Sequence, residues 1–297
     1  MKATRPQRKQ PRQKKGVLIQ MKELERGFMD NTGHTLADYS VALGYFKDAK
    51  AANPTMFGSG VLVRKGERYG ILTAHHCVHS PGPDLKVGNF GGHRLGIVLK
   101  RSHPIIIQPE VIQKQALATP VTRKLEPDLA FLEIAPSPVL SSIKAVASFW
   151  PLDAKSRRKA RKVGKSGTLF TVIGFPGQYQ FKVPATRHSA PRHLIKHMAY
   201  FYVIRAKSLS KRRGWDYVEA TNMYDQGNDL PESFEGVSGG PIWGLVIFKD
   251  KKDQKVKLKG FALIGIAFLQ NRISDKKIKI RGHFIDSIYD QAWQLKN

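Results

Sequence analysis

Residues 234–244 read FEGVSGGPIWG, a serine enclosed by glycines and followed by a proline. A serine hydroxyl is a weak nucleophile unless a base takes its proton, and its attack on a carbonyl creates an oxyanion that needs two preorganised N–H donors. Gly236 lets the backbone turn so that its own N–H and that of Ser238 point to one place. The stretch therefore predicts a nucleophile at Ser238 and an oxyanion hole at Gly236 and Ser238. Taken alone, it also fits a glycine-rich turn between two strands.

A second stretch, YGILTAHHCVH (69–79), leads an apolar strand into His75, His76, Cys77 and His79. The base of a serine hydrolase must stand at the end of a rigid element and be oriented by a third group. A zinc site is the alternative for such a cluster. The spacing argues against it, because adjacent histidines on a strand point in opposite directions and no CxxC or HxxxH partner is present.

A third stretch, LEPDLAFLEIA (125–135), opens an apolar strand with Asp128. A carboxylate that orients a catalytic histidine must be partly buried and accept a hydrogen bond from it, and Asp128 is suitably placed. An aspartate that ends a turn before a strand is the common alternative.

The segments around these motifs predict an all-β protein. After Pro54, short runs rich in Val, Ile and Phe alternate with Gly, Pro and charged turns, which is typical of a β-barrel or sandwich. The charged stretch 154–167 has few apolar residues and fits a surface crossover between two β units.

The sequence patterns at both ends of the chain differ from that of the β-rich region. Residues 1–16 are Lys, Arg, Gln and Pro with little to bury, and they predict a disordered basic tail. Residues 17–53 predict a helical N-terminal extension, and 283–295 predict a C-terminal helix. Apolar residues recur at helical spacing in these segments: Leu18, Met21, Leu24, Phe28, Leu36, Tyr39, Leu43 and Phe46 in the first, and Phe284, Ile285, Ile288, Tyr289 and Trp293 in the second.

The charge balance is strongly basic. Fifty Lys and Arg against 23 Asp and Glu give a formal net charge of +27, which attracts polyanions, acidic proteins or anionic surfaces. Much of the excess lies in four clusters, residues 2–15, 155–165, 207–213 and 251–259. Solvated loops are one interpretation, and contacts to an acidic protein or to nucleic-acid phosphates are the other; no motif for sequence-specific nucleic-acid binding is present.

The single cysteine, Cys77, excludes an intramolecular disulfide and favours a reducing compartment. No run of about 18 apolar residues predicts a membrane span, and no apolar run of signal-peptide length follows the basic start. The expected location is therefore the cytoplasm.

Taken together, the three motifs resemble those of the trypsin/chymotrypsin superfamily of serine peptidases. LTAHHC (72–77) resembles its histidine motif, DLAFL (128–132) its aspartate motif and GVSGGP (236–241) its nucleophile motif. The order His, Asp, Ser matches the chymotrypsin arrangement and differs from those of α/β-hydrolases and subtilisin. The resemblance extends over roughly residues 55–280, and further stretches resemble compact bacterial-type members.

This resemblance implies the fold and the site. It implies two six-stranded antiparallel β-barrels packed together, the first over residues 54–150 and the second, with the C-terminal helix, over 151–297. It assigns the base to His76, its orienting carboxylate to Asp128, and the nucleophile to Ser238.

Two departures limit what the resemblance implies. Val237 stands where the secreted digestive enzymes carry an aspartate that pairs with a freshly cut N-terminus, so no activation of that kind is expected. The disulfide beside the histidine is missing, so Cys77 is expected to be a small buried hydrophobe.

The expected substrate pocket lies between residues 230–236 and 262–268. Glu232 and Glu235 would favour a basic side chain at the cleavage site, whereas Leu263, Ile264 and Phe268 would give an apolar pocket; the sequence leaves both open.

The predicted function is a serine endopeptidase that acts on polypeptides without a cofactor or metal. Two alternatives stand beside it. One is a protease-fold binding module without activity, and the other is a basic nucleic-acid-binding protein in which GVSGGP is an incidental turn.

Overall fold

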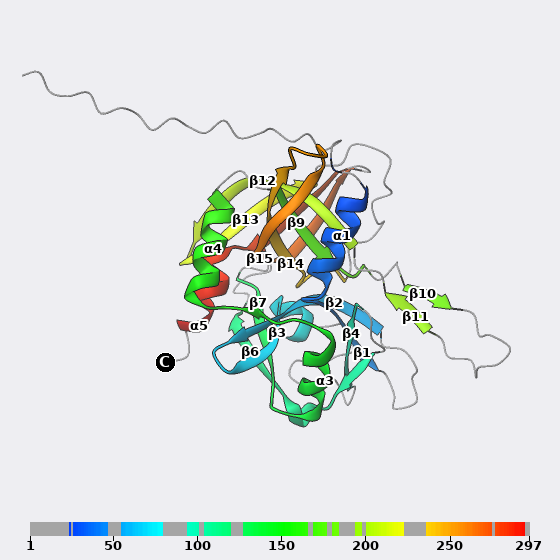
Figure 1. The fold of residues 1–297 in the computed structure, drawn as a ribbon. Coiled ribbons are helices and arrows are strands. Elements are labelled where there is room, and N and C mark those ends of the chain that lie inside the picture. Colours follow the sequence, from blue (N-terminus) through cyan, green and yellow to red (C-terminus); the bar gives the residue numbers. More distant parts are fainter. Residues whose placement is uncertain are drawn as a thin grey trace, which may run out of the picture.

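The computed structural model describes residues 24, 26–46, 55–79, 94–100, 104–119, 127–165, 169–176, 180–183, 194–197, 200–222, 236–274 and 277–294. Figure 1 shows two antiparallel sheets stacked on one another, with helices only at their margins. The prediction of an all-β protein with two packed β units is confirmed.

The first sheet contains β1 (Ser40–Phe46), β2 (Thr55–Lys65), β3 (Arg68–Thr73), β4 (Arg94–Leu99), β5 (Ile105–Ile107), β6 (Ile112–Ala118), β7 (Leu129–Ile134) and the short β8 (Trp150–Pro151). Its strand order is β5-β4-β1-β2-β3-β7-β6, and β8 pairs with β2 in parallel. This corrects the expected six strands, because β1 and β8 add to the sheet. Within the described residues, no pairing between β5 and β6 closes it into a barrel.

The N-terminal extension is helical only in part. Helix α1 spans Arg26–Ala37 and lies beside the second sheet, whereas Ser40–Phe46 forms β1 between β2 and β4. The prediction of a helix through this segment was wrong. Six of the seven β1 residues are buried, and a strand buried on both faces has no alternating pattern to set it apart from a helix. Residues 1–16 and the segment 17–23 lie outside the described residues.

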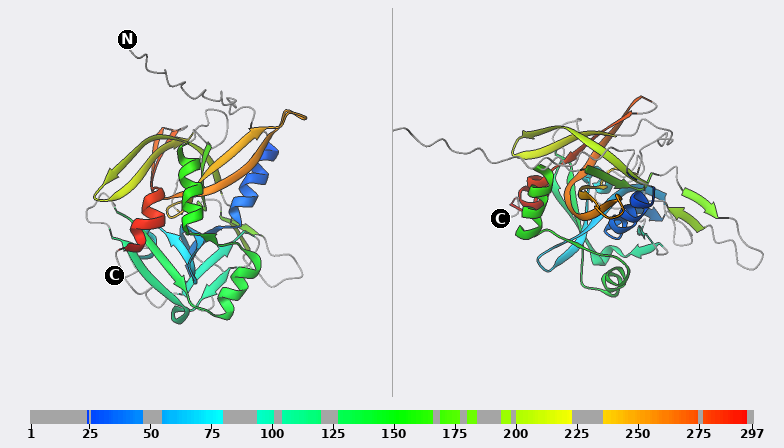
Figure 2. Two further views of the ribbon diagram at one scale, coloured as in Figure 1. Left: turned by 60° about the vertical axis from the view of Figure 1, so that its left-hand side comes forward. Right: turned by 45° about the horizontal axis from the view of Figure 1, so that its top comes forward.

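The second sheet closes into the six-stranded barrel that was predicted. Its order is β12-β13-β16-β15-β14-β9, and its strands are β9 (Leu169–Gly174), β12 (Tyr200–Arg212), β13 (Trp215–Asn222), β14 (Pro241–Lys249), β15 (Val256–Ser274) and β16 (Lys277–His283). Strands β10 (Gln180–Val183) and β11 (Leu194–His197) pair only with each other, and Figure 2 shows them standing away from both sheets.

Short helices occupy the margins. They are α2 (His75–His79), the 3-10 turn η2 (Pro109–Val111), α3 (Pro138–Val146), α4 (Ala154–Lys165), the π-turn η4 (Ser287–Gln291) and α5 (Ala292–Gln294). The crossover between the two sheets is α4, a helix with Ala160 and Val163 buried. The C-terminal helix was predicted correctly, and Ile288 and Tyr289 are among its buried residues. Among the described residues, no helix has the length and apolar character needed to cross a membrane.

An aromatic cluster joins the two sheets. Trp150 and Tyr39 come from the chain around the first sheet, and Trp243 and Phe261 from the second. The Trp150 and Trp243 ring centroids are 5.2 Å apart, and Trp243 and Phe261 are 5.5 Å apart. The Trp150 indole N–H donates to the Tyr289 hydroxyl at 2.7 Å, which ties the C-terminal helix to the cluster. The two sheets are therefore held in one arrangement by a buried aromatic interface.

Candidate active site

Neighbouring strands bring His76 and Asp128 together. Strand β3 ends at Thr73 and α2 begins two residues later, while Asp128 immediately precedes β7; Thr73 and Ala130 are paired in register. Asp128 accepts a hydrogen bond from the His76 backbone N–H at 2.9 Å, and its other oxygen lies 2.5 Å from His76 Nδ1. The histidines thus begin a short helix, which corrects their expected placement on a strand.

The environment of this pair favours the charged imidazolium. The Asp128 side chain is completely buried, whereas the His76 side chain is 28% exposed. Burial of the ring lowers the pKa of His76, but the charge that Cys77 can carry and the hydrogen bond to Asp128 raise it, and the net direction is upward. Because Nδ1 faces Asp128, Nε2 is the nitrogen left to exchange a proton with another group.

A second histidine supports Asp128 from the other sheet. The Asp128 backbone N–H donates to His283 Nε2 at 3.0 Å. His283 ends β16, is fully buried, and packs beside the rings of Tyr217 and Phe268 at 5.1 Å each. Burial lowers the pKa of His283 to about 3, so the ring is neutral. The sequence motifs did not reveal this residue, because nothing near it marks it as functional.

The nucleophile motif forms the tight turn predicted for it. Residues 236–239 form the turn before β14, with φ of 92° at Gly236 and 85° at Gly239. Only glycine adopts such angles readily, and a Cβ at Gly239 would collide with Thr73 and the Ser59 carbonyl. The turn therefore fits closely against the first sheet only because it carries glycine.

Ser59, in β2, joins this turn to the first sheet. Its N–H donates to the Ser238 carbonyl at 2.7 Å, and its hydroxyl donates to the Gly236 carbonyl at 2.5 Å. The same hydroxyl accepts from the Phe175 N–H at 2.9 Å. These bonds direct both turn carbonyls toward Ser59. In the part of the chain that the structure describes, neither the Gly236 N–H nor the Ser238 N–H has an acceptor, which leaves both donors for an oxyanion.

The Ser238 hydroxyl is directed toward β15. It donates to Gln270 Oε1 at 3.2 Å and lies 3.5 Å from the Phe268 carbonyl. Cys77 contacts both residues: its sulfur donates to the Ser238 carbonyl oxygen at 3.4 Å and lies 3.7 Å from His76 Nε2. The structure thus gathers the three predicted residues at the junction of the sheets, without a hydrogen bond between Ser238 and His76 among the described contacts.

The residues that were expected to bind substrate are the next part of the site to compare with the structure. Ile264 is completely buried, and a Cβ at Gly244 would meet Val163 and Ile264 together, so its side chain lies in the core between β14 and α4. This corrects its expected position in a pocket. The Phe268 ring is also buried, and only its backbone carbonyl reaches Ser238. Glu232 lies outside the described residues. Gln270, which was not considered from the sequence, is the side chain that contacts Ser238.

The structure gives Cys77 and Val237 the packing roles expected of small apolar residues. Cys77 is 1% exposed, and Val237 is completely buried against Gly174, where a Cβ would overlap its side chain. Within the described residues, no group of three or more His, Cys, Asp or Glu side chains is arranged to hold a metal ion.

Comparisons with known proteins give no family. No protein-family model matches the chain, and no curated protein matches it significantly. Three solved structures are similar to this chain at low sequence identity. One, from work on the coupled folding and binding of the Sesbania mosaic virus VPg protein, is 14% identical, with a TM-score of 0.42 over 85% of this chain and 88% of its own.

The other two are named as proteases. The MamO protease domain of Magnetospirillum magneticum is 12% identical, with a TM-score of 0.41 over 86% of this chain and 96% of its own. The tobacco vein mottling virus protease is 8% identical, with a TM-score of 0.36 over 85% of this chain and 79% of its own. Similarities at these TM-scores do not indicate the function of this chain.

Proposed function

We propose that this chain is a serine endopeptidase that cleaves peptide bonds with Ser238 as nucleophile, His76 as general base and Asp128 as the orienting carboxylate. The observation that carries the proposal is the buried Asp128 side chain, which contacts both the backbone N–H and Nδ1 of His76. A carboxylate held in this way fixes the imidazole ring and stabilises its charged form.

The chemistry follows from these positions. Ser238 Oγ attacks the carbonyl carbon of the scissile bond while its proton moves to His76 Nε2, and the carbonyl oxygen becomes an oxyanion that accepts the Gly236 and Ser238 N–H groups. The C–N bond then breaks as His76 gives its proton to the leaving amine. A water molecule, deprotonated by His76, attacks the acyl-enzyme and releases the second product. No cofactor is required.

This cycle requires the Ser238 hydroxyl to leave Gln270 and turn toward His76. Such a turn about χ1 is a change of rotamer, and catalytic hydrogen bonds are often long or absent before substrate binds. The single cysteine supports a reducing compartment, and we place the enzyme in the cytoplasm.

Cleavage of an unfolded protein tests this proposal. The wild type is expected to cut reduced, alkylated casein into peptides that mass spectrometry resolves, whereas Ser238→Ala and His76→Ala are expected to release none above background. Equal peptide release by the wild type and Ser238→Ala would refute the proposal, because cleavage would then come from another source.

A protease-fold binding module without activity is the second candidate. The observation that favours it is the hydrogen bond from Ser238 to Gln270, which occupies the nucleophile. Gln270→Ala distinguishes the two: it would release Ser238 and leave or raise turnover in an active enzyme, and it would produce no cleavage in an inert module.

A further inference from the structure

A basic face is formed by helix α4 and strand β12 of the second barrel. Every charged residue of α4 and of β12 is a lysine or arginine. We define this basic face by the exposed cations of these elements and of the turn after β12, which are Lys155, Arg158, Lys159, Lys162, Arg205, Lys207, Lys211 and Arg213. A hollow of about 310 Å³ is lined by Arg161 of α4 and Leu209 of β12, so the two elements border one surface.

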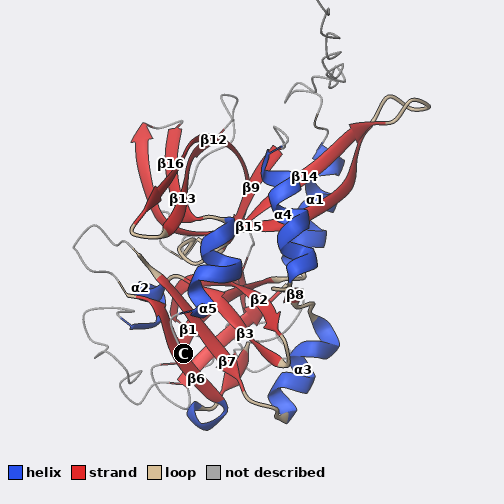
Figure 3. Cartoon of the chain, turned by 90° about the vertical axis from the view of Figure 1, so that its left-hand side faces the viewer, coloured by secondary structure: helices blue, strands red, loops and turns tan. Residues whose placement is uncertain are grey.

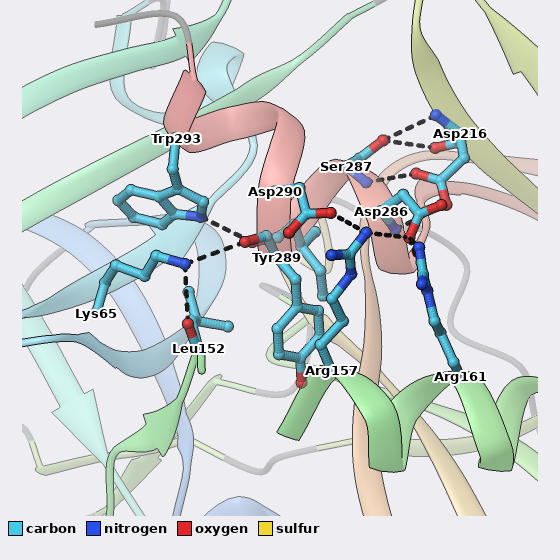
Figure 4. Close-up of polar contacts among 11 residues, drawn as sticks. Lys65, Leu152, Arg157, Arg161, Asp216, Asp286, Ser287, Tyr289, Asp290 and Trp293 are labelled. Atoms are coloured by element: carbon cyan, nitrogen blue, oxygen red, sulfur yellow. Dashed lines mark hydrogen bonds and ion pairs between the residues drawn. The ribbon is translucent and has the colours of Figure 1, made fainter. Parts of the chain in front are cut away.

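Ion pairs fix the inner side of α4. Figure 4 shows Arg157 and Arg161 directed toward Asp286 of the C-terminal helix. Arg157 also pairs with Asp290. These contacts and the buried Val163 hold one side of the helix against the protein. Lys155, Arg158 and Lys162 are exposed to solvent, whereas Lys159 Nζ lies over the Trp150 and Phe261 rings. The two carboxylates that line the hollow are engaged in the same network: Asp286 contacts Arg157 and Arg161, and Asp216 accepts the backbone N–H groups of Asp286 and Ser287.

The like-charged side chains on the outward side of α4 repel one another. Lys155 and Lys159 are four residues apart, as are Arg158 and Lys162, and like charges at this spacing destabilise a helix. Burial and the charge of Lys155 hold the pKa of Lys159 below its usual value. In the described part of the chain, no acidic side chain forms an ion pair with Lys155, Arg158 or Lys162. A polyanion would remove this repulsion.

The composition of the basic face indicates which kind of polyanion it binds. Ala160 and Val163 of α4 are buried, and Leu209 of β12 is the one large apolar side chain that is exposed among the described residues of these two elements. The face therefore lacks the apolar side with which an amphipathic helix enters a lipid bilayer. Among the side chains whose exposure the structure describes, the face shows no exposed aromatic residue. It is rich in lysine, whereas protein interfaces are depleted in lysine and enriched in aromatic residues. Lysine and arginine on a polar surface are the groups that contact phosphates. We propose that the basic face formed by α4 and the β12–β13 hairpin binds the phosphate backbone of nucleic acid, without reading its sequence.

This binding is separate from the proposed proteolysis and is tested without it. A fluorescein-labelled 20-nucleotide poly(U) strand and a 20-base-pair DNA duplex are titrated with the full chain, and anisotropy gives Kd between 50 and 200 mM NaCl. Binding at 50 mM salt that weakens by about tenfold or more at 200 mM is expected, because each neutralised phosphate releases counterions.

Two matched variants locate the site. Arg158→Glu/Lys162→Glu changes the basic face, and Lys251→Glu/Lys252→Glu makes the same change in charge in the exposed β14–β15 turn. The first is expected to weaken binding at 50 mM salt by about tenfold or more and to lower the salt slope by about two. The second is expected to weaken it less than threefold. The basic residues 2–15 are identical in both variants.

The outcomes separate the alternatives. Equal weakening by both variants would overturn the proposal, since binding would then follow net charge alone. Absence of binding at 50 mM salt, or tighter binding to polyglutamate or to phosphatidylserine vesicles, would overturn it as well. If Arg158→Glu/Lys162→Glu fails to fold by circular dichroism, Arg158→Gln/Lys162→Gln takes its place, and unchanged affinity in that folded variant would contradict the proposal.

Discussion

Asp128 connects the first sheet, the candidate base and the second barrel through separate atoms. Its two oxygens contact His76, and its backbone N–H donates to His283. A buried carboxylate with these partners holds the imidazole of His76 in one ring orientation. In the proposed mechanism, the orientation of His76 depends on this residue.

Asp128→Asn is expected to lower the rate at which a fluorophosphonate probe labels Ser238 by about 10⁴-fold, as loss of the carboxylate does in other triads. His76 must be neutral to act as a base, and its hydrogen bond to Asp128 raises its pKa. The wild-type labelling rate should therefore rise with pH above the ordinary histidine pKa, and the residual rate of the variant should reach its plateau at lower pH. Labelling time courses at a series of pH values measure the rate and its pH dependence.

A pH profile of the labelling rate that is the same in Asp128→Asn and the wild type would contradict this role. Asp38→Asn removes a carboxylate from a surface ion pair and is the control.

His283 is expected to make the fold sensitive to acid. Its pKa is lowered to about 3 by burial, so its contribution to stability is fully present above the unfolded value near 6.5 and is lost as pH falls below it. The loss should approach about 1.4 kcal/mol per pH unit, the slope for one proton. His283→Gln, which can still accept the Asp128 N–H, should remove that slope. Urea unfolding from pH 7 to pH 4 measures it, and equal slopes would refute this view.

The sequence singled out the candidate catalytic residues but not the residues that support them. Ser238, His76 and Asp128 each stand in a local pattern that chemistry requires, so the sequence predicted them. Ser59 and His283 act through contacts with residues far along the chain, and no local pattern marks a residue whose role depends on tertiary packing.

Among the secondary-structure elements, the C-terminal helix depends on a cap supplied by another strand. Asp216 of β13 accepts the N–H groups of Asp286 and Ser287, at 2.9 and 2.6 Å. Figure 3 shows this helix between the two sheets, where it adjoins α4. The first turn of a helix has N–H groups without intrahelical acceptors, so a carboxylate here stabilises it.

Asp216→Ala is expected to destabilise the protein by about 1–2 kcal/mol, the upper range for loss of a helix cap. Arg161→Ala removes a half-exposed ion pair with Asp286 and should cost no more than about 1 kcal/mol. Urea denaturation monitored by tryptophan fluorescence compares the two. A larger loss for Arg161→Ala than for Asp216→Ala would show that the ion pair, not the cap, holds this helix.

At this scale the sequence predicted the exposed and amphipathic elements better than the buried ones. The C-terminal helix shows its apolar face in the sequence, whereas β1 is buried along nearly its whole length and gave a pattern that looked helical. The hydrophobic periodicity of a segment distinguishes a helix from a strand only when one face of the segment is buried and the other is exposed.

In the molecule as a whole, the aromatic cluster around Trp243 sets the relation of the two sheets. Trp243→Ala is expected to destabilise the protein by about 3–5 kcal/mol, because it leaves a cavity between them. Phe248→Ala, at a position 41% exposed, is the matched control and should change stability by less than about 0.5 kcal/mol. Urea unfolding measures both, and similar losses for the two would contradict an interface role for Trp243.

Labelling of Ser238 by a covalent probe tests whether this site activates its serine. The intact chain is treated with a fluorophosphonate probe, and peptide mass spectrometry locates the adduct. We expect one adduct on Ser238 in the wild type, none in folded Ser238→Ala, and at most slow labelling in His76→Ala. A folded wild type that takes up no probe, or an adduct that persists in Ser238→Ala, would contradict the claim that this site activates its serine.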